Sequence, residues 1–279
     1  MFRIWKEHRH FGKQIFLLSK NELIKTYKGA FLGFGWAIIK PLITLFALWF
    51  MFQIGLRGDG MRHGHAFFYF LLAGYVPWFY INDNILYGAK CIRQNSQFVT
   101  KISYPVSTIM TFTALSKLYI HIFLTAIMYV VLLIAGYTPS VYNLQFFLYC
   151  PLMFLFFLGL SWITAPLSVF SRDFENLVNS ILTMLFWMSG VLWDSYSVAG
   201  TWLNRIMLLN PINFIVNGYR KTFLYGEWFW QRSFETANKT IQTTDALWEN
   251  VIFLAELVLV LAIGAYNYNR TRKTMPDIL

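Results

Sequence analysis

The side chains best able to do chemistry in this chain are charged residues that lie inside long apolar segments. Lys40 lies in the first turns of one such segment, Asp83 lies near the end of the next, and Glu256 lies in the middle of the last. A charge in such a place costs several kcal/mol unless it is solvated or paired. Lys40 can extend to the lipid headgroups, or it can bind a phosphate group of a substrate. Glu256 needs a partner inside the protein, for which Lys117 and His121 are the candidates.

Other kinds of chemistry find little support. His63 and His65 could be two metal ligands, but only Asp59 lies near them in the sequence, which is too few for a typical site. The chain has no Gly-x-x-x-x-Gly-Lys-Ser/Thr motif, so it does not hold ATP in a P-loop. Paired acids and Ser–His or Cys–His clusters are absent from the sequence, and Cys91 and Cys150 are expected near opposite membrane faces, where they cannot pair. We therefore expect no catalytic site, metal or cofactor in this chain.

The composition is that of an integral membrane protein. Of the 279 residues, 57% are hydrophobic and only 13% are charged, whereas soluble domains carry about 25% charged residues. The mean hydropathy is +0.48. Aromatic residues make up 20% of the chain; they can form belts at the membrane interfaces, or they can line a path for sugars, whose apolar ring faces stack on aromatic rings. No apolar segment of the kind found in a cleavable signal peptide follows the first ten residues.

Six apolar segments approach the length of about 20 residues that a bilayer crossing requires. Because lipid offers no partner for backbone polar groups, such segments must be helical. We therefore predict an all-α integral membrane protein with six transmembrane helices within a membrane domain of residues 36–279. The approximate ranges are 36–54, 66–86, 108–134, 144–170, 177–192 and 247–266.

The distribution of Lys and Arg predicts the orientation of these helices, because cytoplasmic loops are enriched in both. Seven precede the first segment, three lie in the loop between the second and third segments, and three lie in the C-terminal tail, whereas loop 136–143 carries no charge. Both termini are therefore expected in the cytoplasm. The net charge of +10 is mostly this bias and does not imply binding to nucleic acid.

Residues 1–35 form a unit of their own before the first transmembrane segment. The basic, half-apolar sequence up to Lys28 suits an amphipathic helix that lies on the cytoplasmic membrane surface. Gly29, Gly33 and Gly35 then allow the chain to turn into the bilayer. Trp36 suits the headgroup level, where its ring is apolar and its N–H is wet.

Residues 193–246 are too many for a turn and too polar for a membrane crossing. Two amphipathic pieces, residues 201–209 and 212–225, are separated by Asn210-Pro211, a pair that favours a break. They could form a re-entrant helical pair between spans five and six, or two helices that lie on the outer surface. A re-entrant pair leaves Arg220 and Lys221 at the outer interface, whereas a full crossing would bury each of them in lipid at a cost of about 2.5–3.5 kcal/mol.

Loop 90–105, between the second and third segments, is polar and basic. It carries the single apolar residues Phe98, Ile102 and Tyr104. Isolated apolar side chains on a polar helix are sensible anchors in a pocket of a partner protein. The alternative is a solvated loop whose basic residues only set the topology.

Three stretches of the sequence resemble the permease subunits of ABC transporters that export polysaccharides, the ABC-2 class. The family has a Tyr-basic-x-small-x-Leu-Gly-x-x-Trp stretch before an early proline, an Arg-Asp pair after the fourth span, and an Asn-Pro…Arg…Gly order before the last span. The matching residues are Tyr27, Lys28, Leu32, Gly33, Trp36 and Pro41, then Arg172 and Asp173, then Asn210, Pro211, Arg220 and Gly226. Asp173 is also placed to favour the start of its own helix. Within the family the chain is most similar to the permeases that translocate teichoic acid.

The resemblance implies a function in export rather than catalysis. Such permeases act in the bacterial cytoplasmic membrane as homodimers bound to two ATPase subunits, which hold ATP and Mg²⁺, and they move a lipid-pyrophosphate-linked polymer outward. Loop 90–105 would then couple to the ATPase, and residues 193–246 would be re-entrant. The expected coupling residues are Arg93, Gln94, Asn95, Phe98, Lys101, Tyr104, Arg172 and Asp173, and the expected substrate path contains Trp36, Lys40, Tyr75, Trp78, Phe79, Arg220 and Glu256.

The cargo expected from the resemblance is wall teichoic acid, with O-antigen, capsular polysaccharide or a drug as alternatives on the same fold. An alternative from another class is a multi-span membrane enzyme that acts on lipid-linked sugars, such as an acyl- or glycosyltransferase. That class would need a cluster of acids or histidines beside one interface, which the sequence does not contain.

Overall fold

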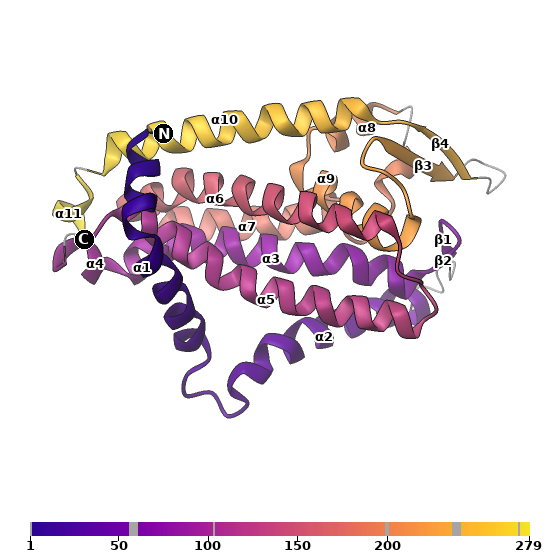
Figure 1. Cartoon of the computed structure of the whole chain (residues 1–279), viewed down its shortest axis with the longest axis horizontal. Helices are drawn as coiled ribbons and strands as arrows, with labels where there is room; N and C mark the ends of the chain where they lie inside the picture. The colour runs from indigo at the N-terminus through magenta and orange to yellow at the C-terminus, as the bar shows by residue number, and fades with distance from the viewer. Residues whose placement is uncertain (1, 56–60, 103, 199–200, 236–240, 273) are drawn as a thin grey trace.

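The computed structural model describes residues 2–55, 61–102, 104–198, 201–235, 241–272 and 274–279. These residues form an elongated bundle with both termini at one end, the terminal end, and two short β-hairpins at the other, the hairpin end (Figure 1). The helices are α1 (Phe2–Tyr27), α2 (Trp36–Trp49), α3 (Phe67–Gln94), α4 (Ser96–Thr100), α5 (Val106–Ile134), α6 (Phe146–Phe170), α7 (Asp173–Met188), α8 (Trp202–Leu208), α9 (Pro211–Arg220), α10 (Leu247–Thr271) and α11 (Met275–Ile278). The strands are β1 (Met61–Arg62), β2 (His65–Ala66), β3 (Gln231–Glu235) and β4 (Ile241–Asp245).

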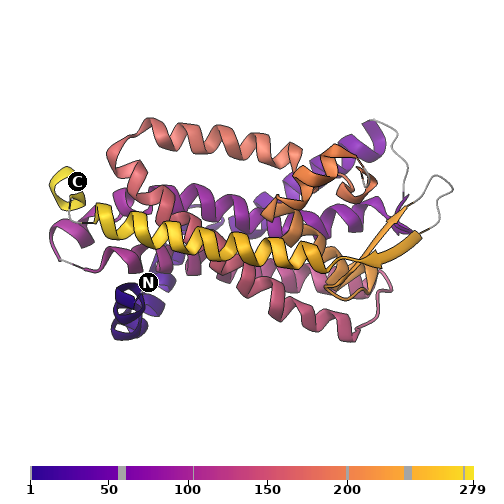
Figure 2. The same ribbon diagram turned by 90° about the horizontal axis from the view of Figure 1, so that it is seen from above.

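Helix α3 is the centre of the bundle. It packs against α5, α6, α7 and α9, and α10 packs on α6 (Figure 2). Its polar side chains are paired inside the protein: the Asn84 amide donates to the Tyr80 hydroxyl at 2.6 Å, and the Ser161 hydroxyl of α6 donates to Asn84 Oδ1 at 3.1 Å. Because these groups are satisfied internally, a helix with several polar residues can be the most buried one.

Helices α6 and α10 approach each other closely through glycine. A Cβ atom on Gly264 of α10 would lie 2.6 Å from the Gly159 carbonyl oxygen of α6 and 3.0 Å from Trp162 Cβ. Small residues at a helix contact let two backbones come together in this way. This contact is the reason that α10 can lie along α6.

The N-terminal helix α1 lies across the terminal end of the bundle rather than along it (Figure 1). Its buried residues Ile4 and Ile15 face the bundle, where α1 packs on α5. Gly29 and Gly33 have φ angles of +86° and +49°, which glycine adopts without strain, and the chain turns there into α2. The predicted helix and glycine turn are therefore present, and their place on a membrane surface stays a prediction.

Each of the six predicted transmembrane segments coincides with a helix: α2, α3, α5, α6, α7 and α10. Within the described part of the chain, four helical segments are long and apolar enough to cross a membrane, namely Gly33–Gly55, Val106–Ile134, Val141–Phe170 and Leu247–Thr271. Helices α3 and α7 are not among them, since α3 carries charged and polar residues and α7 has only 16 residues. That these two also cross stays a prediction.

The region between α7 and α10 contains two short helices, α8 and α9, close to the predicted amphipathic pieces. The Asn210 side chain accepts hydrogen bonds from the backbone N–H groups of Ile212 and Asn213, and Pro211 follows at the start of α9. This is a favoured start for a helix. Helix α9 continues into a π-helical turn, Lys221–Tyr225, and ends at Gly226.

The two antiparallel hairpins, β1–β2 and β3–β4, correct the all-α expectation, although the chain remains mostly helical. Both lie in polar connections at the hairpin end (Figure 1). Residues 199, 200 and 236–240 of the predicted re-entrant region, and residue 103 of loop 90–105, lie outside the described residues.

Candidate functional site

A cavity of about 240 Å³ lies between α2, α3 and α7. Lys40, Tyr75, Trp78 and Phe79, four of the residues predicted for the substrate path, line it together. The lining is completed by Thr44, Asn82, Asn179, Leu182, Thr183 and Phe186. The structure thus brings residues from three separate segments of the chain to one site.

One wall of this cavity is aromatic. Tyr75, Trp78 and Phe79 are three and four residues apart, so they share one face of α3. Phe186 of α7 lies beside them, with its ring centroid 5.3 Å from that of Trp78 and 6.5 Å from that of Tyr75. Such rings present flat apolar surfaces with polar edges.

Uncharged polar residues and one lysine supply the remaining contacts. Lys40 is exposed on α2, so its ammonium is free to meet an anion. Sequence reasoning missed Asn82, which follows Tyr75 by seven residues and shares its helix face; helical periodicity could have identified it. It also missed Thr44, Asn179 and Thr183, of which the last two lie on α7, and no signal in the sequence pairs α7 with α3.

Glu256 lies apart from this cavity, and the predicted pairing of its carboxylate is wrong. Within the described residues Glu256 is half-buried on α10, and its carboxylate has no hydrogen bond or ion pair there. Its two candidate partners are engaged elsewhere: Lys117 Nζ lies 3.6 Å from the centre of the Tyr87 ring, and His121 Nε2 lies 2.6 Å from the Tyr219 hydroxyl. Trp36, another predicted path residue, is exposed at the start of α2 and does not line the cavity either.

Arg220 was predicted at the outer interface, but it is fully buried, with 0% exposure. Its guanidinium donates to the carbonyl oxygens of Gly190 and Val191, at 2.5 and 2.7 Å, and lies 3.6 Å from the centre of the Phe70 ring. These carbonyls follow the last turn of α7. The arginine therefore joins α9 to α7 and α3, and it is not available to a substrate.

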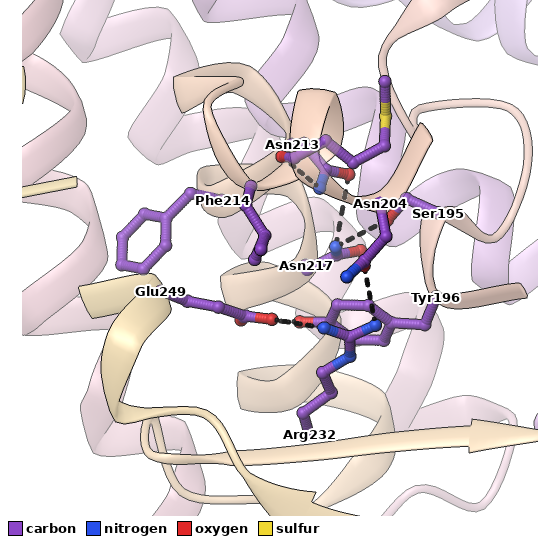
Figure 3. A pocket seen from close by; sticks show the side chains of 10 residues that line it. Ser195, Tyr196, Asn204, Asn213, Phe214, Asn217, Arg232 and Glu249 are labelled. Carbon is purple, nitrogen blue, oxygen red and sulfur yellow. Dashed lines mark hydrogen bonds and ion pairs between the residues drawn. The ribbon is translucent and has the colours of Figure 1, made fainter. Parts of the chain in front are cut away.

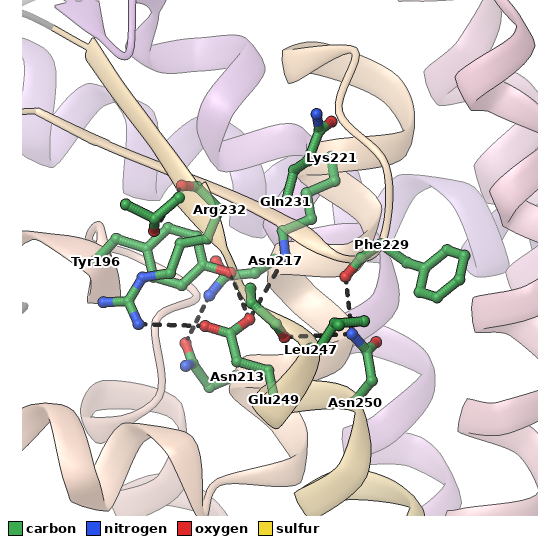
Figure 4. Close-up of polar contacts among 12 residues, drawn as sticks. Tyr196, Asn213, Asn217, Lys221, Phe229, Gln231, Arg232, Leu247, Glu249 and Asn250 are labelled. Carbon is green, nitrogen blue, oxygen red and sulfur yellow. Dashed lines mark hydrogen bonds and ion pairs between the residues drawn. The ribbon is translucent and has the colours of Figure 1, made fainter.

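Lys221 is also buried rather than exposed at the outer interface. The Glu249 carboxylate at the start of α10 pairs with Lys221 at 3.5 Å and with Arg232 of β3 at 3.3 Å, and it accepts a hydrogen bond from the Tyr196 hydroxyl at 3.1 Å (Figure 4). Arg232 also donates to Asn204 of α8. The Glu249 carboxylate thus links α10 to β3, to the π-helical turn after α9 and to the segment that contains Tyr196.

A small polar pocket lies beside this cluster, with side chains from α8, α9, β3 and α10 converging on it (Figure 3). Its volume is about 10 Å³, which is room for no more than a water molecule. The pocket is therefore part of the internal packing of the hairpin end and not a place for cargo.

A larger groove, of about 450 Å³, is lined by residues of α3, α6, α7, α8, α9 and α10. Its lining is almost wholly apolar, with Asn210 as the polar exception among the described residues. None of the residues predicted for the substrate path contributes to it. Its chemistry suits hydrocarbon chains rather than sugars or phosphates.

The terminal end brings the two predicted coupling segments together. Arg93, at the end of α3, donates to the Ser168 carbonyl of α6 and pairs with Glu175 in the first turn of α7 at 3.1 Å. Arg172 and Asp173 are exposed in the same junction. Asp173 lies in the first turn of α7, where its charge complements the helix dipole, but Arg172 occupies the N-cap position and no side chain caps the helix.

The apolar residues of loop 90–105 face the bundle more than predicted. The half-buried Phe98 ring lies 5.7 Å from that of Tyr104 and 5.9 Å from that of Phe112, and Tyr104 lies 5.1 Å from Phe11. Burial raises the pKa of the Tyr104 phenol. Phe98 and Tyr104 are therefore half-buried rather than exposed as predicted, and their contact with a partner stays a prediction. Ile102, which is 61% exposed, is the exposed large apolar side chain among the described residues of this loop.

Three other predicted coupling residues divide between surface and interior. Gln94 and Lys101 are exposed, as contact with a partner requires. Asn95 is buried, and its amide donates to the Cys91 carbonyl at 3.0 Å. Asn95 therefore shapes the turn between α3 and α4 and does not face outward.

The two histidines of the β1–β2 hairpin have protein partners. His63 Nε2 lies 2.7 Å from the Asp194 carboxylate, and His65 Nδ1 lies 3.0 Å from the Tyr137 hydroxyl. Burial and the neighbouring His63 lower the pKa of the His65 ring. Asp59 lies outside the described residues, and among the described ones no group of three or more His, Cys, Asp or Glu side chains could hold a metal.

Comparison with known proteins identifies the family of this chain. The protein O-antigen export system permease protein RfbA of Myxococcus xanthus is 25% identical over 224 residues, which cover 80% of this chain and 85% of the relative. A protein of the same name from Klebsiella pneumoniae is 23% identical over 213 residues, covering 75% of this chain and 80% of the relative. The family profile described as ABC-2 type transporter matches residues 13–224, which is most of the chain and runs from α1 to the end of the α9 region. This chain belongs to the ABC-2 type transporter family.

Proposed function

We propose that this chain is the transmembrane subunit of an exporter that moves a lipid-linked polysaccharide across the bacterial cytoplasmic membrane. The cavity between α2, α3 and α7 carries the proposal, because an aromatic wall, uncharged polar side chains and one lysine meet there. The aromatic wall suits the apolar faces of sugars, and Lys40 suits the phosphate of a lipid carrier. The name shared by the relatives supports a polysaccharide as cargo.

In this proposal ATP is hydrolysed outside the chain. Two copies of the chain form a homodimer that binds two ATPase subunits, and these subunits hold ATP and Mg²⁺. The coupling surface is the exposed part of the terminal end, where Ile102, Lys101, Arg172 and Asp173 lie. Both termini share this end and are therefore cytoplasmic.

We propose an O-antigen-type polysaccharide as the cargo. Wall teichoic acid, the cargo predicted from the resemblance, carries a phosphate in each repeat, and Lys40 is the one cation among the described residues that line the cavity. One lysine suits a single phosphate at the lipid end of a polymer. Adding each lipid-linked polymer to the assembled complex and measuring the rate of ATP hydrolysis distinguishes the two cargoes.

The proposed membrane arrangement has six crossings, with α8 and α9 entering the outer leaflet and returning. Neither short helix approaches the roughly 20 residues of a crossing. Helices α3 and α7 cross as part of the bundle, because Asp83 and Asn84 of α3 are buried by its neighbours and need not meet lipid.

Single cysteines in a chain lacking Cys91 and Cys150 test this arrangement. The Trp202→Cys and Thr243→Cys variants, at exposed positions of α8 and β4, are expected to react with an impermeant thiol reagent added outside the cell. The Ile102→Cys variant is expected to react only after the membrane is permeabilised. Labelling of Ile102→Cys and Thr243→Cys from the same side would contradict the arrangement.

The Lys40→Ala variant is expected to need at least about tenfold more lipid-linked polysaccharide for half-maximal stimulation of the ATPase. The reason is the loss of a hydrogen bond to a charged group, worth about 1.5–3 kcal/mol. Lys40→Arg keeps the charge and should stay near the wild-type value. Lys13→Ala, the same change at an exposed position of α1, is the control. If wild type and Lys40→Ala needed the same concentration of polysaccharide for half-maximal stimulation, Lys40 would contact lipid headgroups and not the substrate.

The Ile102→Asp variant is expected to insert and fold normally but to bind the ATPase subunit about tenfold more weakly, because it places a charge where an apolar anchor is needed. Phe98→Asp should instead lower the amount of folded chain, since Phe98 packs within the bundle. Ile241→Asp, the same change at an exposed residue of β4 at the hairpin end, is the control. Titration of the ATPase onto detergent-purified chain measures Kd, and an unchanged Kd for Ile102→Asp would remove α4 and its loop from the coupling surface.

A further inference from the structure

The short C-terminal helix α11 folds back onto the terminal end of the bundle. It contacts α4 and α6, and these three elements lie together beside the C-terminus (Figure 1). Pro276 stands in the first turn of α11, where proline fits a helix start. The Thr274 hydroxyl donates to the Thr271 carbonyl at 2.8 Å, which joins the tail to the end of α10.

Met275 is the residue by which α11 is fixed to the bundle. Its side chain is completely buried, with 0% exposure, and it belongs to the apolar cluster that contains Val99 of α4 and Val169 of α6. Leu279 packs against the same cluster. In contrast, Ile278 on the same helix is 48% exposed.

Helix α4 is held in place by few side chains: Phe98 packs against Phe112 and Tyr104, and Val99 packs into the apolar cluster. It is only five residues long, has no side-chain cap at its start, and buries Val99 as its single fully buried residue. A helix of this length is not stable by itself in water. Its position therefore depends on the packing of Phe98 and Val99. Helix α11 contributes to that packing, because it contacts α4 and adds Met275 to the apolar cluster that contains Val99.

We propose that α11 is a brace for α4, the short helix within loop 90–105. Met275 is then a positioning residue that holds α4 in the orientation in which it binds the ATPase. The inference rests on the proposed function, in which α4 and its loop belong to the coupling surface. Met275 itself does not touch the ATPase. It acts through Val99 and the apolar cluster beneath α4.

The test is a titration of the ATPase subunit onto the purified full-length chain carrying Met275→Glu. Burial of a carboxylate in an apolar cluster is unfavourable, so α11 is released and α4 loses its cover. We expect Kd to rise about tenfold while the number of binding sites per chain stays at the wild-type value. Met275→Leu keeps the apolar volume and should restore Kd to within about twofold of wild type.

Ile278→Glu, the same kind of change on the exposed side of the same helix, should leave Kd unchanged. Three results would overturn the brace: a wild-type Kd for Met275→Glu; fewer binding sites with an unchanged Kd, which would mean that the tail only supports folding; or an equal rise for Ile278→Glu, which would mean that the tail touches the ATPase directly. The experiment also distinguishes failure of the proposed function. If α4 and its loop do not bind the ATPase, Ile102→Asp leaves Kd unchanged as well, whereas if only the brace is wrong, Ile102→Asp still raises Kd.

Discussion

The Arg220→Leu variant is expected to lose roughly 3–5 kcal/mol of its free energy of unfolding. The fully buried guanidinium donates to the Gly190 and Val191 carbonyls, and leucine leaves both without this donor in a place that water does not reach. The loss corresponds to about 10 °C in the melting temperature of a chain of this size. Thermal unfolding of the purified chain in detergent measures it.

The Arg205→Leu variant is the matched control, because Arg205 is exposed on α8 and the same change there should stay within about 0.5 kcal/mol of wild type. Arg220→Lys keeps the charge but lacks the planar fork that reaches two carbonyls. We expect it to suffer most of the same loss. A wild-type melting temperature for Arg220→Lys would show that the charge matters and the fork does not.

The Gly264→Val variant is the second change with a large expected effect. A Cβ atom at this position would lie 2.6 Å from the Gly159 carbonyl oxygen, which belongs to backbone and cannot move aside as a side chain can. Helix α10 must then separate from α6, and we expect a loss of about 3 kcal/mol or more. The folded fraction that remains in detergent after heating measures the effect.

Two other variants, with smaller expected losses of stability, serve as comparisons for Gly264→Val. Gly159→Ala should cost less, because the nearest atoms to its Cβ would be side-chain atoms of Leu261 and Val260, at 3.0 and 3.1 Å, rather than a backbone oxygen at 2.6 Å. Ala262→Val adds a similar volume at an exposed position of α10 and should be close to neutral. If Gly264→Val were no worse than Ala262→Val, the close contact between α6 and α10 would be of no importance to stability.

Much of the fold follows from local features of the sequence. The apolar runs predicted α5, α6 and α10 within a few residues, and the glycine cluster predicted the turn between α1 and α2. Asn210-Pro211 predicted the break between α8 and α9, because Asn at an N-cap and Pro in the first turn act through the neighbouring backbone alone. These signals need no knowledge of which helices touch.

The remaining features depend on contacts between segments far apart in the chain. Arg220 on an amphipathic helix suggested an outer surface, and only the end of α7 explains why it is buried. Phe98 and Tyr104 suggested anchors for a partner, and only their packing with Phe112 and Phe11 shows that they belong to the bundle. In the cavity, the α2 and α3 residues were predicted, whereas Asn179 and Thr183 required the pairing of α7 with α3.

Helix α7 is fastened by an arginine at each end. Arg93 pairs with Glu175 in its first turn, and Arg220 binds the Gly190 and Val191 carbonyls just after its last turn. Between these points Val178 and Leu182 are the only described residues of the helix that are buried.

Mechanically, α7 is held firmly at its two ends and is only lightly packed between them. A helix held only at its ends bends most easily near its middle when it is compressed along its axis, and Asn179 and Thr183, which lie in the middle of α7, line the cavity. The Arg93 contact lies at the terminal end, beside α4, whereas the Arg220 contact is buried in the opposite half of the bundle. We expect that a small displacement at the Arg93 end changes the width of the cavity, while the Arg220 contact holds the other end of the helix in place.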